Sequence, residues 1–170
     1  TITVNGVSKG FAMTGWRVGF IGAPLWIAKA CNKIQGQVTS ATCAIAKKAA
    51  ERAMLADPRS TTQEMKDTFL KRRDMILAEL NNIEGIKCNV PQGAFYVFPD
   101  ISYCFGKSDG TTTINNSDDF CMYLLNYAHV ALVAGDSFGN PECVRISYAA
   151  ADDKLMQAMD RIKKQLAQLN

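Results

Sequence analysis

Apolar residues recur at three- and four-residue steps along several stretches of this 170-residue chain, which predicts amphipathic helices. The clearest stretch is the last, and its apolar positions are Leu155, Met159, Ile162, Leu166 and Leu169. A longer stretch begins near Thr62, and its apolar positions are Met65, Phe69, Ile76, Leu80 and Ile83. Charged residues occupy much of the remainder of this longer stretch. Both are therefore predicted to pack through one face, and the second is long enough to connect two subdomains.

The first third of the chain reads as strand, strand, helix, helix. Thr1 to Val4 and Arg17 to Ala23 predict strands, and a helix is expected from Pro24 because proline suits the first turn. A second helix is expected from about Ala41 to Leu55. Asp57-Pro58 then ends it, since a residue before proline is disfavoured in helical conformation.

The later part mixes β and helical patterns. Residues 86–98 predict a β-rich section, and residues 106–116, rich in Gly, Ser, Thr and Asn, predict a loop. Ser117 is expected to cap a helix that has two aspartates in its first turn. This helix is expected to carry to the core the side chains of Phe120, Tyr123, Leu124 and Tyr127. With strands at residues 130–133 and 143–148, the order of elements indicates an α/β chain.

Composition excludes several classes of protein. The net charge is +3 and the basic residues are scattered, so no nucleic-acid track is indicated. No apolar run reaches the roughly 18 residues that span a membrane. The six cysteines are irregularly spaced and His129 is the single histidine, which argues against a metal site and against a histidine-dependent triad. Buried, reduced thiols and a cytoplasmic location are expected.

The candidate chemistry lies between Ser8 and Gly19, where Lys9 and Arg17 are eight residues apart. A lysine amine forms a Schiff base with a carbonyl, and an arginine holds a phosphate through a bidentate fork. Pyridoxal 5'-phosphate carries both groups. Ser8 offers a further hydrogen bond to such a cofactor.

Four segments, in order, resemble fold-type I pyridoxal-phosphate aminotransferases of class I/II, most closely the bacterial aspartate aminotransferase group. They are Val4 to Gly22, Gly93 to Val97, Gly135 to Gly139, and Val144 to Ala149. The resemblance implies the C-terminal portion of the transferase fold, in which a long helix joins the end of the large domain to a small α/β domain. Residues 1–56 would then be the remnant of the large cofactor-binding domain, and residues 57–170 the small domain.

The resemblance also implies roles for individual residues. Lys9 would form the covalent aldimine with the cofactor and later act as the base, while Arg17 and Ser8 would bind the cofactor phosphate. Arg145 would grip the substrate carboxylate, since a planar fork suits a carboxylate better than an ammonium does. Phe95 would wall the substrate pocket.

Two positions depart from the family pattern, and part of the site has no candidate. Gly6 stands where the family often has serine, and Ala134 stands where it often has proline. The acidic partner of the cofactor nitrogen would lie before Thr1. The intact protein is therefore expected to be a homodimer that moves an amino group from an amino acid such as aspartate to a 2-oxo acid such as 2-oxoglutarate, and the fragment alone is expected to be inactive.

Three alternatives remain open from the sequence. The same fold and lysine serve other aminotransferase specificities and lyases. A second alternative is the aminotransferase-like effector domain of a transcription regulator, which binds the cofactor as a signal. A third is a folded piece without chemistry of its own.

Overall fold

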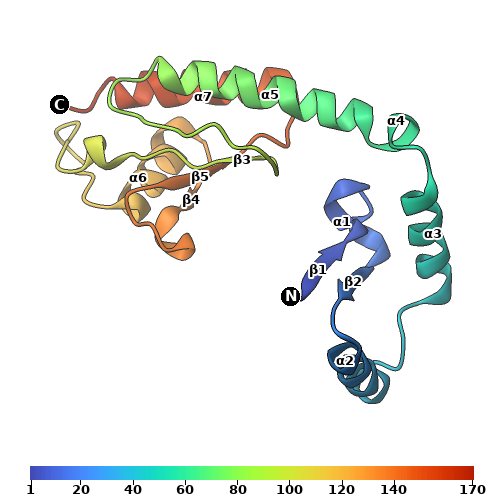
Figure 1. The fold of residues 1–170 in the computed structure, drawn as a ribbon. Coiled ribbons are helices and arrows are strands. Elements are labelled where there is room, and N and C mark those ends of the chain that lie inside the picture. Colours follow the sequence, from blue (N-terminus) through green and yellow to red (C-terminus); the bar gives the residue numbers. More distant parts are fainter. The chain divides into compact units, whose positions relative to one another are not determined.

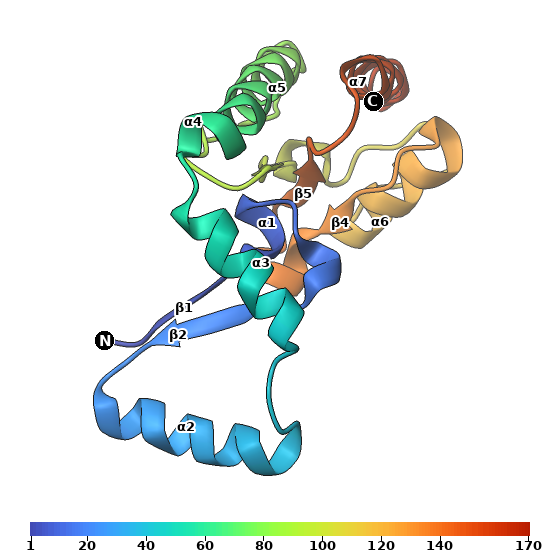
Figure 2. The same cartoon turned by 90° about the vertical axis from the view of Figure 1, so that its right-hand side faces the viewer.

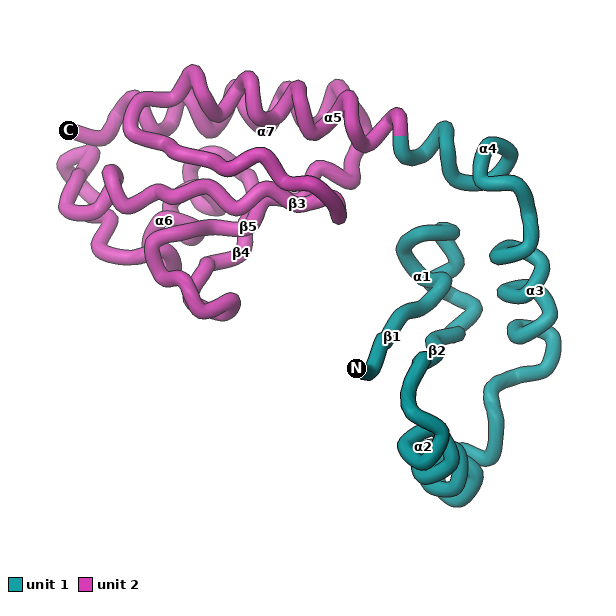
Figure 3. The backbone as a smooth tube through the Cα atoms, viewed as in Figure 1, with its two compact units in different colours: residues 1–66 teal, residues 67–170 magenta.

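A computed structural model describes all 170 residues, which divide into two compact units, residues 1–66 and residues 67–170 (Figure 3). The division lies inside the longest helix, whereas the sequence suggested a boundary at the Asp57-Pro58 break. Assignment of residues 1–56 to a large domain stays a prediction. Each unit is described separately below.

The first unit pairs two short strands and follows them with helices (Figure 1). Its elements are β1 (Thr3–Gly6), α1 (Val7–Gly10), the 3₁₀ helix Thr14–Trp16, β2 (Gly19–Gly22), α2 (Leu25–Val38), α3 (Ala44–Leu55) and α4 (Pro58–Thr61). The strands are antiparallel, with Thr3 opposite Gly22 and Gly6 opposite Gly19. The two expected strands and two expected helices are confirmed, although each strand is displaced by about two residues from its expected start.

This unit has almost no core of its own. Only Val7, Ala46 and Ala50 are buried, whereas many large apolar side chains are exposed, including Trp26 at 74%. The other exposed large apolar residues of the unit are Ile2, Val4, Trp16, Phe20, Ile21, Leu25, Ile34, Val38, Ile45, Met54 and Leu55. So much exposed apolar surface marks faces that contact further protein.

The second unit has a three-stranded antiparallel sheet in the order β3-β5-β4, and α5 and α7 lie on the same side of it (Figures 1 and 2). The chain enters the unit in α5 (Gln63–Asn81), which begins in the first unit. The later elements are β3 (Tyr96–Val97), the 3₁₀ helix Ser102–Cys104, α6 (Ser117–Tyr123), the π-helix Leu124–Ala128, β4 (Val133–Ala134), the 3₁₀ helix Gly135–Phe138 (η4), β5 (Val144–Ser147) and α7 (Asp152–Leu166).

A continuous core joins these helices to the sheet. Ile76 and Leu80 of α5 and Leu155, Met159 and Ile162 of α7 are all buried in it, as the periodicity predicted. Two ion-pair sets tie the two helices together at their rims. Asp152 accepts from both Lys71 and Arg72 at 2.8 Å, and Lys163 pairs with Glu79.

Three local expectations were wrong. The β-rich section over residues 86–98 reduces to β3 and one isolated bridge at Lys87. The cap of α6 is Asn116, one residue before Ser117, and its Oδ1 accepts from the Asp119 backbone N–H at 2.8 Å. Tyr127 is 51% exposed, because the helix changes to π geometry at Leu124 and the ordinary helical period no longer applies.

Candidate functional site

Lys9 lies on a single helical turn that connects the two paired strands of the first unit. Val7, the first residue of that turn, is fully buried, and its N–H donates to the Val18 carbonyl at 3.2 Å. The Val7 carbonyl in turn accepts from the N–H groups of Phe11 and Met13. One buried valine therefore anchors the turn that presents Lys9.

A hollow of about 310 Å³ lies at this turn, within the first unit. Ser8 and Lys9 both line it, together with Asn5, Gly6 and Phe20. Ser8 is half-buried and Lys9 is exposed. The structure thus brings the predicted amine and hydroxyl to the same cavity.

Arg17 does not line that hollow but is linked to its rim. The guanidinium Nη1 donates to the Thr14 carbonyl at 3.0 Å, and the Thr14 hydroxyl donates to the Ser8 carbonyl at 3.1 Å. Arg17 also has left-handed backbone angles, φ 54° and ψ 49°. Such a conformation costs energy in a non-glycine residue and is often kept at ligand-binding turns.

The glycine at position 6 has a steric reason. A Cβ built on Gly6 would lie 3.0 Å from the Val18 carbonyl oxygen, because β1 and β2 approach closely at the Gly6 to Gly19 pair. A serine there would push the strands apart by a few tenths of an ångström. The departure from the family pattern therefore goes with the close strand spacing in this chain.

Arg145 occupies the middle of β5 in the second unit. Its neighbours Val144 and Ile146 point into the core, so the alternation of a strand puts Arg145 on the opposite face. There its guanidinium carbon lies 4.6 Å from the ring centre of Tyr96 and 4.6 Å from that of Phe138. The guanidinium of the predicted carboxylate-binding residue thus lies over two aromatic rings.

Phe95 borders this arrangement through Tyr96, the ring over which Arg145 lies. Its ring stacks on Phe69 at 5.6 Å and meets Tyr96 at 4.6 Å. Phe69 also contacts Tyr148 edge-on at 6.2 Å. Phe95 therefore connects the Arg145 face to the aromatic packing beneath α5.

Sequence reasoning did not identify Phe138 as a neighbour of Arg145. The available signal was the loop Gly135 to Gly139, whose aromatic residue stands just before β5. His129, the single histidine, is the C-terminal cap of the π-helix, with φ 55°.

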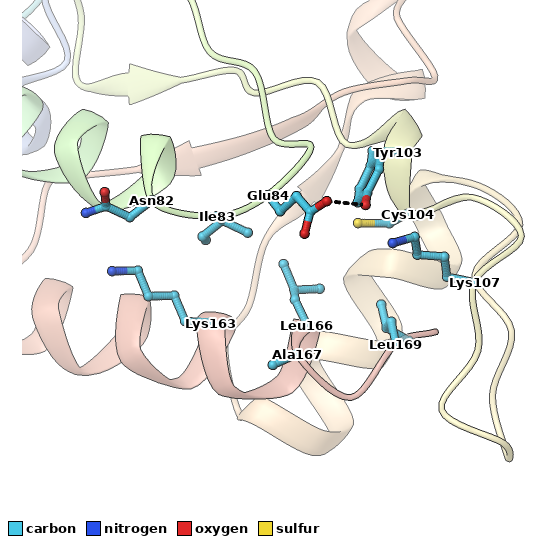
Figure 4. A pocket seen from close by; sticks show the side chains of 10 residues that line it. All are labelled: Asn82, Ile83, Glu84, Tyr103, Cys104, Lys107, Lys163, Leu166, Ala167 and Leu169. Atoms are coloured by element: carbon cyan, nitrogen blue, oxygen red, sulfur yellow. Dashed lines mark hydrogen bonds between the residues drawn. The ribbon is translucent and has the colours of Figure 1, made fainter.

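A second hollow, of about 340 Å³, lies at the far end of α7 in the second unit (Figure 4). Its charged groups are already engaged: Tyr103 donates to Glu84 at 2.8 Å, and the Lys107 ammonium lies 3.8 Å from the Tyr103 ring centre. Lys163 pairs with Glu79. The chain itself balances the charges of this hollow, which shares no residue with the Lys9 or Arg145 sites.

The cysteines differ in exposure. All six are free thiols; Cys104, Cys121 and Cys143 are buried, whereas Cys31 and Cys43 are exposed. The expectation that the thiols are buried is therefore wrong for these last two. Burial, aided by Asp118, raises the pKa of Cys121 to about 11. In the described chain no group of three or more His, Cys, Asp or Glu residues is placed to hold a metal ion.

Comparison with known proteins identifies the fold and family. The chain matches the family model described as aminotransferase class I and II over residues 1–162. The chain belongs to this family. It superimposes on the crystal structure of the aspartate aminotransferase from Rhizobium meliloti with a TM-score of 0.93 and 42% identity, covering 100% of this chain and 42% of that one. The expected α/β transferase fold is thereby confirmed.

Curated relatives agree with this assignment. The chain is 48% identical over 169 residues to a bifunctional aspartate aminotransferase and glutamate/aspartate-prephenate aminotransferase of Petunia hybrida. This alignment covers 98% of this chain and 35% of that protein. It is 44% identical over 163 residues to an aspartate aminotransferase of Rhizobium meliloti, covering 95% and 40%. The chain therefore spans about two fifths or less of the length of these relatives. No helix in the structure is long and apolar enough to cross a membrane.

Proposed function

We propose that this aminotransferase-family chain is part of a pyridoxal-phosphate-dependent enzyme that moves an amino group from aspartate to a 2-oxo acid such as 2-oxoglutarate. The observation that carries the proposal is the presence of Lys9 and Ser8 at one hollow in a chain that matches the family over residues 1–162. The alternative of a regulatory effector domain has no observation in its favour here.

The residues of the Lys9 turn fit the cofactor. Lys9 supplies an amine beside a cavity and Ser8 supplies a hydroxyl. Arg17 donates to the Thr14 carbonyl through Nη1, so its other N–H groups remain for a phosphate. When bound, pyridoxal phosphate withdraws electrons from the substrate α-carbon. The Lys9 amine would then move a proton at that carbon, which is general acid-base work for a positioned side chain.

Arg145 would hold the substrate carboxylate and Phe95 would border the pocket. Names of the relatives suggest the substrates: several are aspartate aminotransferases, and the Petunia protein also acts on glutamate and prephenate by its name. Prephenate is therefore a second candidate acceptor. Two assays of the intact protein, one with aspartate and 2-oxoglutarate and one with glutamate and prephenate, distinguish the two candidate acceptors.

We also propose that the intact protein is a cytoplasmic homodimer. The exposed apolar side chains of the first unit fit contacts with further protein, which a second copy or the additional length that the relatives have would supply. Sedimentation velocity of the intact protein should give twice the chain mass. A monomer at micromolar concentration would contradict this part of the proposal.

The decisive experiment adds pyridoxal phosphate to the intact protein, reduces with borohydride and maps the modified lysine by peptide mass. Label should concentrate on Lys9, and Lys9→Ala should remove both the label and transamination. Lys33→Ala is the control, because Lys33 is an exposed lysine of α2 away from the hollow. Label spread evenly over exposed lysines would exclude a competent site at Lys9.

A further inference from the structure

Two aromatic rings flank the Arg145 guanidinium at equal distance. Tyr96 comes from β3 and Phe138 from η4, and both ring centres lie 4.6 Å from the guanidinium carbon. Phe98 meets Phe138 edge-on, at 6.1 Å and 88°. Aromatic faces attract a cation, so the two rings stabilise a charge that a half-buried position would otherwise disfavour.

Arg145 makes no hydrogen bond or ion pair within residues 67–170, in contrast to Arg72 and Arg73, which both bind carboxylates. No buried side-chain nitrogen or oxygen in the structure lacks a partner. The nitrogens of Arg145 are therefore accessible to solvent. Its guanidinium carbon lies over two rings, while no carboxylate or carbonyl of the unit occupies its N–H donors.

The backbone around η4 holds Phe138 in this place. The Gly135 N–H donates to the Cys143 carbonyl at 2.8 Å, and the Gly135 carbonyl accepts from the Asn140 N–H at 3.1 Å. A Cβ on Gly135 would lie 2.3 Å from the carbonyl oxygens of both partners. Only glycine fits there, and its tight turn brings the end of η4 back over the Arg145 face of β5.

The geometry points to a positioning role: we propose that Tyr96 and Phe138 clamp the Arg145 guanidinium in one plane, so that its free edge receives a substrate carboxylate without reorganisation. This inference rests on the proposed function, because it deepens the role of Arg145 there. An arginine side chain loses considerable rotamer freedom when it is ordered on binding. Rings that order it beforehand lower that cost and favour in-plane, bidentate contact.

The test uses the intact protein and two measurements, the KM for aspartate and the Kd for succinate, a dicarboxylate that has no amine to transfer. Phe138→Leu and Tyr96→Leu should each raise both constants about fivefold, the effect of one lost cation-π contact, with kcat changed less than twofold. Phe138→Tyr and Tyr96→Phe should keep both constants within twofold of the parent values, since each substitution keeps an aromatic face. Tyr127→Leu, which removes an exposed ring elsewhere in the unit, is the matched control.

A double-mutant cycle separates a clamp from general packing. In an Arg145→Ala background, Phe138→Leu should have no further effect on the Kd for succinate, because the group it positions is gone. An equal loss in both backgrounds, or an unchanged Kd in Phe138→Leu alone, would overturn the clamp while leaving Arg145 as the carboxylate site. If Arg145→Ala binds succinate as the parent does, or the parent does not bind it, both the clamp and the proposed role of Arg145 fail. If the parent protein binds succinate but does not transaminate, the proposed reaction is rejected and the clamp stands.

Discussion

The hydroxyl of Tyr148 donates a hydrogen bond to the backbone carbonyl of Ala94, 3.1 Å away, across 54 residues of sequence. Tyr148 is 2% exposed, and its own N–H donates to the Phe95 carbonyl at 3.0 Å. Ala94 has a positive φ of 60°, unusual for alanine. The tyrosine thus holds in place the turn from which β3, with Tyr96, begins.

Replacing Tyr148 by Phe should lower the free energy of unfolding by about 1 kcal/mol, the net contribution of one hydrogen bond. The ring and its contact with Phe69 remain, so only the hydroxyl is tested. Urea denaturation of the 170-residue chain measures the change. Tyr127→Phe, at an exposed tyrosine, should change stability by less than about 0.5 kcal/mol.

Alkaline pH should destabilise the second unit. Burial, the largest cause, raises the pKa of both Tyr148 and Tyr123 above the ordinary 10.0. Each buried phenol therefore contributes stability that is fully present below about pH 10 and is lost as pH rises through the raised pKa. Unfolding free energies measured on both sides of about pH 10 should fall less steeply for Tyr148→Phe. An unchanged slope would mean that Tyr148 does not ionise on unfolding in this range.

The strain at Ala94 predicts opposite effects for the same substitution at two sites. Ala94→Gly should stabilise the chain by about 0.5 kcal/mol, because glycine adopts positive φ without steric cost. Ala158→Gly, inside α7, should destabilise it by about 1 kcal/mol through helix propensity. In thermal unfolding, the midpoint should rise for Ala94→Gly and fall for Ala158→Gly. Two losses of equal size would show that Ala94 is not strained in solution.

Helices were predictable from the sequence, and the short strands were not. Leu155, Met159 and Ile162 lie on one face of the 15-residue helix α7, so their burial follows from spacing alone. The section before β3 also looked extended, but Pro91 lacks an N–H and Ala94 has a positive φ, so the backbone cannot continue a ladder there. Tertiary turns, which spacing does not encode, decided where these strands begin.

The candidate site was predictable in its residues but not in its arrangement. Lys9 was assigned by its neighbours in sequence, and the structure adds the buried Val7 that anchors its turn. Arg145 was assigned as one outward residue of a strand, whereas its placement between Tyr96 and Phe138 depends on the Gly135 turn. Contacts across loops of this kind are invisible to periodicity.

Cys43 should be the most reactive thiol of the 170-residue chain. It precedes α3 and is exposed, and the nearby backbone N–H groups of Ala46 and Ile45 at the start of the helix, with a smaller effect of Lys47, lower its pKa. A thiolate is the reactive form, so iodoacetamide at about pH 7.5 should alkylate Cys43 before the other cysteines. Cys121, whose pKa is raised to about 11 by burial, should react last.

Peptide mass mapping over time gives the order of alkylation, and Cys31, exposed on α2, is the control for access alone. Equal rates at Cys31 and Cys43 would show that exposure, not the helix terminus, sets the reactivity; Cys43→Ser should remove the fast phase and leave the Cys31 rate unchanged.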